Sequence, residues 1–324
     1  MRVVHILPEL ASGGAERLVL AHVRADPSVA IATVFGAGAL DSAFYGANLT
    51  LGERRLGRPS AAAFVRLVRA ARAADIVHTH LFAGNLWGGL AARLAGRPQV
   101  AHEHNVDRDE SAATIAVRTR VGSWPALTIA VSEAAARHSF AQDIVVVENG
   151  VDLARFSAPW SGGSGLLAIG RREPQKGFDV LLAALPPGVR LRVAGVGPYA
   201  MPHPQVEWLG LRSDVPELLR TADILVVPSR WEGFGLVALE AMAAGTPVIA
   251  TAVDGLRELV GNAGLLVPPD DPVALRGAIA RLLGDAGLRT ELSQRGRARA
   301  QRYDLSRTFD GWQRAYGRVV ATGG

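Results

Sequence analysis

Residues 224–250 read ILVVPSRWEGFGLVALEAMAAGTPVIA, and this stretch decides the class of fold. Its two short apolar runs predict strands over Ile224–Val227 and Pro247–Ala250, and the pattern between them predicts a helix over Leu236–Ala243. Two neighbouring strands that are joined by a crossover helix run parallel. The stretch therefore indicates one unit of a parallel α/β sheet.

Short apolar runs alternate with helical patterns along the rest of the chain, so the expected fold class is α/β. The Pro-, Ser- and Gly-rich segment 157–165 separates two sets of such units. We expect two Rossmann-like domains that face a central cleft, with functional residues in the loops after strands. The other expected strands are Val3–Leu7, Ile31–Phe35, Asp75–His78, Gln99–His102, Thr128–Val131, Ile144–Val147, Leu166–Ile169 and Arg190–Ala194. The other expected helices are Ala15–Arg24, Ala61–Ala74, Asn85–Leu94, Glu133–Ser139, Phe178–Ala184, Val215–Leu219 and Val273–Leu283.

The composition excludes several chemistries. The 324 residues include no cysteine, which rules out a disulfide framework, a zinc–thiolate site and a cysteine nucleophile. The formal net charge is +5, but the basic residues are almost all arginine and acids are interspersed among them. We therefore expect no nucleic-acid partner.

No segment is typical of membrane insertion or export. A run of about 18 apolar residues, the length that marks a spanning helix, does not occur. The apolar run at the N-terminus is cut by Pro8. We expect a cytoplasmic protein that is at most attached to the inner face of the membrane.

The loop after the expected strand Ile224–Val227 carries the strongest functional pattern. A helix N-terminus follows the loop, and its free N–H groups suit a phosphate. Gly233 and Gly235 allow a ligand to approach the backbone closely. Glu240 within the helix could reach ribose hydroxyls, and Glu232 on the loop could reach sugar hydroxyls. The competing interpretation, an amphipathic helix with two solvated glutamates, fits poorly with the apolar neighbours of Glu240.

A second pattern, AIGRREPQKGFDVLLAA at 168–184, places two cations after an expected strand. Arg171 and Lys176 suit a diphosphate, whose charge grows as its bond to a sugar breaks. Lys176 is the only lysine of the chain, which places a compact point charge in this loop. The competing interpretation is a solvent-exposed basic turn.

Histidines cluster in the N-terminal half as His78-Thr79-His80 and His102-Glu103-His104. Each cluster is expected after a strand, facing the cleft. Four imidazoles and a carboxylate could form a metal site. For His78 and His80, cleft-wall residues that hydrogen-bond to backbone are an equally good interpretation.

Taken together, these motifs resemble those of retaining glycosyltransferases with the GT-B fold, specifically glycosyltransferase family 4 (glycosyl transferases group 1). The Glu-x7-Glu pattern of that family matches Glu232 and Glu240, and its basic pair matches Arg171 and Lys176. The similarity covers nearly the whole C-terminal half and is patchy before it. Further similar segments are ILPELASGGAERLV (6–19), AVSEAAARHS (130–139), VVENGVDLARF (146–156), RVAGVGP (192–198), VEWLGLRSDVPELLRTADILVVPS (206–229), VDGLRELV (253–260), GLLVPPDDPVAL (264–275) and RYDLSRTFDGWQRAYGRVV (302–320).

The resemblance implies a role for each matched residue. Glu240 would bind the ribose and Glu232 the transferred sugar, while Arg171 and Lys176 would stabilise the departing diphosphate. His104 would face the donor sugar and the acceptor. Because the family usually needs no metal, no metal site and no cofactor are expected, and the nucleotide sugar is a substrate. The remaining expected donor-binding residues are Gly13 and Gly14 beside the phosphates, Gly233, Phe234, Gly235 and Leu236 in the Glu232 loop, and Leu211 in the region of the base.

The same resemblance assigns the domains. Residues 1–155 would form the acceptor-side domain, 156–303 the nucleotide-sugar-binding domain, and 304–324 a helix that crosses back onto the first domain. The expected role is glycan biosynthesis, with a glycan, a lipid-linked sugar or a small molecule as acceptor. An Asp-x-Asp triplet, Asp107-Arg108-Asp109, is interpreted as solvated or facing the acceptor.

The expected helix Ala61–Ala74 carries Arg66, Arg69 and Arg72. A basic amphipathic helix could rest on an anionic membrane and collect a lipid-linked acceptor. The alternative, which we favour, is a Rossmann helix that buries Phe64 and Leu67 and keeps its arginines in water.

Two other classes of function remain open at this stage. A nucleotide-sugar epimerase of the same fold would use the donor half and need no acceptor. A non-catalytic nucleotide-sugar-binding module would explain the folds but not the gathering of Glu232, Glu240, Arg171 and Lys176. A dehydrogenase is disfavoured because the chain has no GxGxxG pattern.

Overall fold

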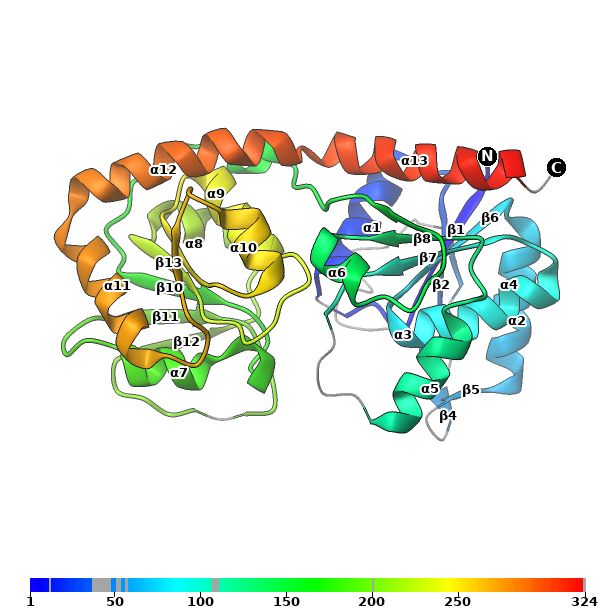
Figure 1. Cartoon of the computed structure of the whole chain (residues 1–324), viewed down its shortest axis with the longest axis horizontal. Helices are drawn as coiled ribbons and strands as arrows, with labels where there is room; N and C mark the ends of the chain where they lie inside the picture. The colour runs from blue at the N-terminus through cyan, green and yellow to red at the C-terminus, as the bar shows by residue number, and fades with distance from the viewer. Residues whose placement is uncertain are drawn as a thin grey trace. The chain divides into compact units, whose positions relative to one another are not determined.

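The computed structural model describes residues 1–11, 13–36, 48–50, 54–55, 58–106, 111–199 and 201–322. Contacts divide the chain into two compact units (Figure 1). The first unit comprises Met1–Glu148 and Phe309–Gly324, and the second comprises Asn149–Thr308. Each unit is a parallel sheet covered by helices, as the alternating sequence pattern predicts.

The first unit is built on a seven-stranded sheet in the order β3-β2-β1-β6-β7-β8-β9, and its strand pairs are parallel. The strands are β1 Val3–Leu7, β2 Ala30–Thr33, β3 Asn48–Thr50, β6 Ile76–His80, β7 Gln99–Glu103, β8 Leu127–Ala130 and β9 Ile144–Val146, with a separate short pair of β4 Arg54–Arg55 and β5 Arg58–Pro59. The helices are α1 Gly14–Ala25, α2 Ala61–Ala73, α3 Leu81–Ala83, a π-helical turn Gly84–Gly88, α4 Gly89–Ala95, α5 Ala112–Val121 and α6 Glu133–Arg137.

Side-chain alternation along β1 supplies two cores, one on each face of the first sheet. Val4 and Ile6 pack with Leu67 of α2 and Ala91 of α4 on one face. Leu7 belongs to a second cluster that includes Val19 and Val23 of α1. Because successive strand residues point to opposite faces, His5 lies on the face opposite to Val4 and Ile6.

The second unit is built on a six-stranded parallel sheet in the order β12-β11-β10-β13-β14-β15. The strands are β10 Leu166–Ile169, β11 Leu191–Ala194, β12 Val206–Gly210, β13 Ile224–Val227, β14 Val248–Thr251 and β15 Leu265–Val267. The helices are two 3₁₀ turns, Leu153–Phe156 and Pro174–Lys176, then α7 Phe178–Ala184, α8 Val215–Thr221, α9 Leu236–Ala244, α10 Asp254–Val260, α11 Pro272–Gly284, α12 Ala286–Ala300 and a 3₁₀ turn Gln301–Tyr303.

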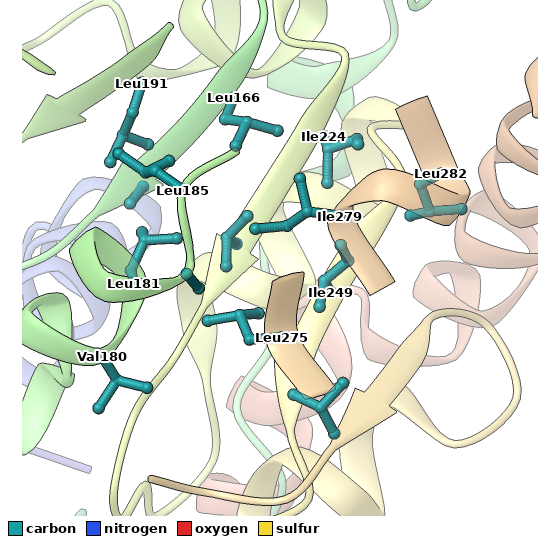
Figure 2. Close-up of a cluster of buried hydrophobic side chains, with 14 of the residues drawn as sticks. Leu166, Val180, Leu181, Leu185, Leu191, Ile224, Ile249, Leu275, Ile279 and Leu282 are labelled. Atoms are coloured by element: carbon teal, nitrogen blue, oxygen red, sulfur yellow. The ribbon is translucent and has the colours of Figure 1, made fainter. Parts of the chain in front are cut away.

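The core of the second unit joins the middle of its sheet to α7 and α11 (Figure 2). Leu166, Leu191, Ile224 and Ile249 come from four strands, and all are almost fully buried. They meet Leu181 of α7 and Leu275, Ile279 and Leu282 of α11. Burying one such side chain contributes about 1.5–3 kcal/mol to the stability of the fold. The cluster therefore holds the four strands and the two helices together.

The last helix, α13 Leu305–Thr322, begins in the second unit and continues in the first. Trp312 and Tyr316 of α13 are fully buried in the first unit. Arg318 adds an ion pair to Asp143, with 2.7 Å between guanidinium nitrogen and carboxylate oxygen. The expected return of the C-terminal helix to the first domain is thereby confirmed.

Several elements differ from the expectation. The expected helix Asn85–Leu94 is a π-helical turn followed by the shorter α4. Helix α12 was missed because it buries mainly small or polar side chains, among them Ser293, Gly296 and Ala300. Strand β15 was missed because three residues are too few to show a period. Within the residues that the structure describes, none of the helices combines the length and the apolar character that crossing a membrane requires.

The chain order reverses once in each sheet. Strands β1, β2 and β3 extend one way and β6 to β9 the other, so the reversal lies between β1 and β6. In the second unit it lies between β10 and β13. Open α/β sheets bind ligands at the carboxyl ends of the strands beside such a reversal. The loops after β10 and β13 are therefore the first place to look for a site.

Candidate active site

The two loops that follow β10 and β13 meet through an ion pair. Lys176 Nζ donates to Glu232 Oε2 over 2.8 Å, although the two residues are 56 positions apart. Their side chains are only 21% and 15% exposed, so the pair is largely shielded from solvent. Ser229 Oγ donates to the same carboxylate oxygen over 3.2 Å. The basic loop and the glutamate loop that the sequence singled out thus form one cluster.

Backbone contacts hold these loops together. Gly177 ends the turn that carries Lys176 and has a φ of +62°, which favours glycine. A Cβ atom at Gly177 would collide with the carbonyl oxygen of Pro228 at the end of β13. The N–H of Arg230 donates to Gln175 O over 2.8 Å, and Gln175 Nε2 donates to Trp231 O over 3.1 Å. The position of Lys176 is therefore set by β13 as much as by β10.

Arg230 also links the two loops. The sequence analysis did not identify this residue. Its guanidinium donates to Pro174 O and to Asp179 Oδ2, both over 2.6 Å, and to Asp270 Oδ1 over 2.7 Å. The hydrogen bonds from Arg230 lower the pKa of the Asp179 carboxyl below its usual value. Because arginines are frequent throughout this chain, nothing in the sequence marked this one as a structural clamp.

Gly235 is the N-cap of helix α9, and its φ of +102° again favours glycine. A Cβ there would lie 2.5 Å from Leu256 Cδ2 of α10, so the loop and α10 are in close contact. Leu236 and Glu240 are half-buried, whereas Leu239 and Met242 are fully buried. Since Leu236 and Glu240 are four positions apart, they share the open face of α9 near its N-terminus.

Phe234 lies within the glutamate loop. Its side chain is buried and packs against Tyr303, with 5.8 Å between ring centroids. Gly233 beside it is also buried. The Phe234 ring therefore anchors the loop, and contact of this segment with a donor stays a prediction.

Two other expected residues of the second unit lie apart from the ion pair. Arg171 is 57% exposed at its side chain and pairs with Glu173 over 3.2 Å. Leu211 is half-exposed immediately after β12, the edge strand, where Gly210 has a φ of +66°. The structure thus brings Lys176 and Glu232 into contact and leaves Arg171 apart from them, exposed and paired with Glu173.

In the first unit, Gly13 and Gly14 stand at the start of α1, after the loop that follows β1. Gly13 is the N-cap, and a Cβ atom at this position would collide with the Glu16 carboxylate. Glu16 is itself only 5% exposed and was missed at the sequence level. The two glycines begin the helix that follows β1, a strand beside the sheet reversal, and their contact with donor phosphates stays a prediction.

His104 follows β7 and lines a pocket of the first unit. Burial lowers its pKa from 6.5 to about 3, so the imidazole is neutral at physiological pH. Glu103 and Arg118 form an ion pair of 3.4 Å in the same wall. Leu81 adjoins them with a φ of +60°, which is unusual for a residue with a side chain and is often found at functional sites. The other lining residues are Phe82, Asn85, Ala101, Asn105, Val121, Gly122, Pro125, Thr128, Phe140 and Ala141.

The sequence analysis expected the other histidines to follow their strands and line a cleft, and this expectation is wrong. His78 and His80 lie within β6 and His102 within β7, and all three are fully buried. His78 and His80 have side-chain rather than backbone partners, because residues two apart on a strand share a face and meet their neighbours across the sheet. Parallel register pairs His78 with His5 of β1, which the sequence interpretation had overlooked, and pairs His80 with His102. Glu103 is paired with Arg118, so the suggested set of four histidines and a glutamate is not assembled. The Asp107–Asp109 triplet lies outside the described residues.

The fold is that of the GT-B glycosyltransferases. HepE from Anabaena, in a structure with UDP and glucose, superposes with a TM-score of 0.87 over 98% of this chain and 99% of that chain, at 21% identity. Sucrose-phosphate synthase from Thermosynechococcus elongatus gives a TM-score of 0.80 over 99% and 100%, at 22% identity. At these identities the likeness concerns the fold.

Sequence comparison supplies the family. Residues 3–155 match the model of Glycosyltransferase Family 4, and residues 163–285 match that of Glycosyl transferases group 1. D-inositol 3-phosphate glycosyltransferase from Salinispora arenicola is 32% identical, over 79% of this chain and 71% of that protein. Phosphatidyl-myo-inositol mannosyltransferase from Mycolicibacterium smegmatis is 36% identical, over 60% and 58%. The chain therefore belongs to the glycosyltransferases of family 4 and group 1, and it is a glycosyltransferase.

Proposed function

We propose that the chain transfers a sugar, with retention of anomeric configuration, from a nucleoside diphosphate sugar to an acceptor hydroxyl, and that the transfer step needs no metal. The observation that carries this proposal is the shielded Lys176–Glu232 pair at the sheet reversal of the second unit. A carboxylate and a cation in one loop cluster match the two halves of the donor, a sugar with hydroxyls and a diphosphate with negative charge. HepE was crystallised with UDP-glucose, which supports a donor of this class.

The chemistry assigned to these residues follows from charge. As the bond between the anomeric carbon and the diphosphate breaks, negative charge develops on the bridging oxygen. A lysine ammonium placed at that oxygen stabilises it, and the exposed guanidinium of Arg171 can be recruited to the outer phosphate. Glu232 accepts hydrogen bonds from sugar hydroxyls, and Glu240 on the open face of α9 accepts them from the ribose. The cations of Lys176 and Arg171 then neutralise the charge that a divalent metal ion neutralises in metal-dependent enzymes.

The pocket beside His104 is the proposed acceptor side. A neutral imidazole, a paired Glu103 and Arg118, and the aromatic rings of Phe82 and Phe140 line it. Such a mixture suits a polyol or sugar, whose hydroxyls hydrogen-bond while its ring packs on aromatic carbon. The names of the relatives include D-inositol 3-phosphate and phosphatidyl-myo-inositol as the molecules they act on. Inositol phosphates and inositol lipids are therefore the first acceptors to try.

The direct test is product analysis. The full chain is incubated in EDTA with UDP-glucose or GDP-mannose, with and without inositol acceptors, and products are identified by mass spectrometry and NMR. We expect a glycosylated acceptor whose anomeric configuration equals that of the donor. An inverted product would refute the retaining mechanism. Conversion of the donor sugar to its epimer without acceptor would favour an epimerase, and binding without any turnover would favour a non-catalytic module.

Contact with a membrane through α2 is a separate expectation. Leu67 and Ala71 are buried against the sheet, while Arg69 and Arg72 are exposed. We propose a cytoplasmic enzyme, since a chain without cysteine suits a reducing compartment, and we expect weak binding of α2 to anionic vesicles. Co-sedimentation with phosphatidylserine vesicles tests this. Equal binding by the wild type and an Arg69→Glu/Arg72→Glu variant would exclude α2 as the contact.

A further inference from the structure

Six of the eight histidines of the chain gather inside the first unit. Four lie on adjacent strands, one lies on α1, and one follows β7. Their rings contact one another, with 4.8 Å between the centroids of His5 and His78 and 4.3 Å between those of His78 and His80. Trp312 of α13 lies over the group, 5.0 Å from the His78 ring. The six are His5, His22, His78, His80, His102 and His104.

Burial keeps these imidazoles neutral. Desolvation lowers the pKa of His5, His78 and His80 well below 6.5, and neighbouring histidines lower it further. It also lowers the pKa of His22 to about 4. A neutral imidazole has a free lone pair on one nitrogen, which is the form that binds a metal ion.

Three of the rings present one nitrogen each to a common point. One nitrogen from each of His5, His78 and His80 lies within 4.8 Å of the others. His5 Nδ1 and His80 Nε2 are 2.7 Å apart. His78 Nε2 is buried and has no hydrogen-bond partner among the described residues. A fully buried polar atom without a partner is uncommon, and it indicates a partner that the protein chain does not supply.

The other nitrogen of each ring is engaged outside the trio. His5 Nε2 lies 2.9 Å from His22 Nδ1, and His80 Nδ1 lies 3.0 Å from His104 Nε2. His78 Nδ1 lies 2.6 Å from Tyr316 Oη. Histidines that bind metals almost always donate their second N–H to such a partner, which fixes the tautomer and the ring orientation. All three rings meet this condition at once.

We propose that His5, His78 and His80 bind a divalent transition-metal ion, zinc in the first instance. Imidazole nitrogens suit zinc, which binds them at about 2.0–2.1 Å in tetrahedral geometry, so nitrogens about 3.3 Å apart are needed. To bind the ion, His5 Nδ1 and His80 Nε2 must move slightly farther apart than 2.7 Å. Any two nitrogens of the trio that are more than about 3.3 Å apart must move closer together. His102 is stacked 5.2 Å from His78, and neither of its ring nitrogens has a partner among the described residues.

A second trio, His80, His102 and His104, meets the same distance limit but suits an ion less well. His104 is partly exposed and lines the pocket, and no second-nitrogen partner is present for His102 among the described residues. The first trio is fully buried and has an outer partner for every ring.

The proposed ion has a structural role that does not depend on the proposed function. It joins β1 to β6 and, through Tyr316, to α13, all within the first unit. An ion that binds only the folded state raises its stability by an amount that grows with the ion concentration. Zinc should therefore raise the melting temperature of the protein in the absence of any sugar nucleotide.

The experiment uses the full chain without a polyhistidine tag. The protein is treated with a chelator, loaded with zinc sulfate, passed over a desalting column and analysed for metal by mass spectrometry. Cobalt loading gives a visible spectrum that reports nitrogen ligands. We expect about one zinc per chain and a higher melting temperature. Less than about a tenth of an equivalent in the wild type would overturn the proposal without any variant.

Two variants locate the ion. His78→Phe removes the ligand and keeps an aromatic ring in the stack, and it should abolish zinc binding. Tyr316→Phe leaves the ligands and removes only the outer partner, so zinc affinity should fall about 10–100-fold while the fold is kept. His138→Gln is the matched control, because His138 is an exposed histidine of the same unit outside the group, and it should bind zinc like the wild type. Unchanged zinc binding in both test variants would place the ion elsewhere and overturn the assignment.

Discussion

Lys176 is held in place from two directions. Its ammonium is paired with Glu232, and its aliphatic stem passes Gly170, where a Cβ atom would lie 3.4 Å from Lys176 Cγ. Both contacts direct the charge to the loop cluster at the end of β10. A side chain so confined can act at one position of a ligand, which is what stabilisation of a departing group requires.

Lys176→Ala should mainly lower turnover. Loss of one donor to the developing charge costs about 10²–10³ in kcat, and KM should change much less because the ground-state donor keeps its other contacts. Steady-state kinetics with a saturating acceptor measures both constants. Arg295→Ala, at a half-exposed arginine of α12, is the control and should be silent. Wild-type turnover in Lys176→Ala would remove this residue from the mechanism.

Glu240→Ala should instead weaken nucleotide binding. A hydrogen bond to a charged group contributes about 1.5–3 kcal/mol, so Kd should rise about 10–100-fold. Calorimetric titration with the free nucleoside diphosphate measures this without an acceptor. Glu217→Ala, at an exposed acid of α8 paired with Arg220, should leave Kd unchanged. If both variants bound equally well, the ribose would be recognised elsewhere.

At the scale of elements, the central strands of the second unit could be predicted because they are largely buried on both faces. β10 and β13 are continuous apolar runs, and the sequence defined both to the residue. The sequence analysis expected Lys176 and Glu232 to serve one donor site, but their direct contact depends on the strand order, which only the structure gives. The Arg230 clamp and the histidine group could not be predicted, because they depend on register and on side-chain partners far apart in the chain.

Gly177→Ala should separate the two loops. The substitution forces an alanine into a left-handed conformation and drives its Cβ into the Pro228 carbonyl. Gly188→Ala is a matched control, because Gly188 has a φ of +77° but no atom within 4 Å of the added Cβ. The control should lose about 1–2 kcal/mol of unfolding free energy, and Gly177→Ala should lose more. Urea denaturation gives both values, and nucleotide affinity should fall only in Gly177→Ala. Equal losses would mean that the loops adjust to the extra atom.

At the scale of the whole molecule, α13 is the element that both units share. Its residues from Phe309 on belong to the first unit, where Trp312 is fully buried and lies 5.4 Å from the His5 ring. The C-terminal segment is thus part of the core of a unit whose first strand begins at Val3. Removing this segment would expose the histidine face of the sheet.

Trp312→Ala should destabilise the first unit by about 3–5 kcal/mol, the usual cost of deleting a buried aromatic side chain. Val320→Ala, at a residue of the same helix that is 52% exposed, should cost little. Chemical denaturation followed by circular dichroism compares the two. A small loss in Trp312→Ala would show that α13 contributes little to the stability of the first unit.

The second unit is proposed to bind a nucleoside diphosphate without a metal ion. The most direct measurement is the change in melting temperature on adding UDP, GDP or ADP, with and without EDTA, for the wild type and Glu240→Ala. EDTA can lower the starting temperature by removing an ion from the histidine group, so the increment caused by the nucleotide is the quantity compared. We predict an increment from one nucleotide that is the same in EDTA and is reduced in Glu240→Ala. No increment from any nucleotide, or one that EDTA abolishes, would contradict this account.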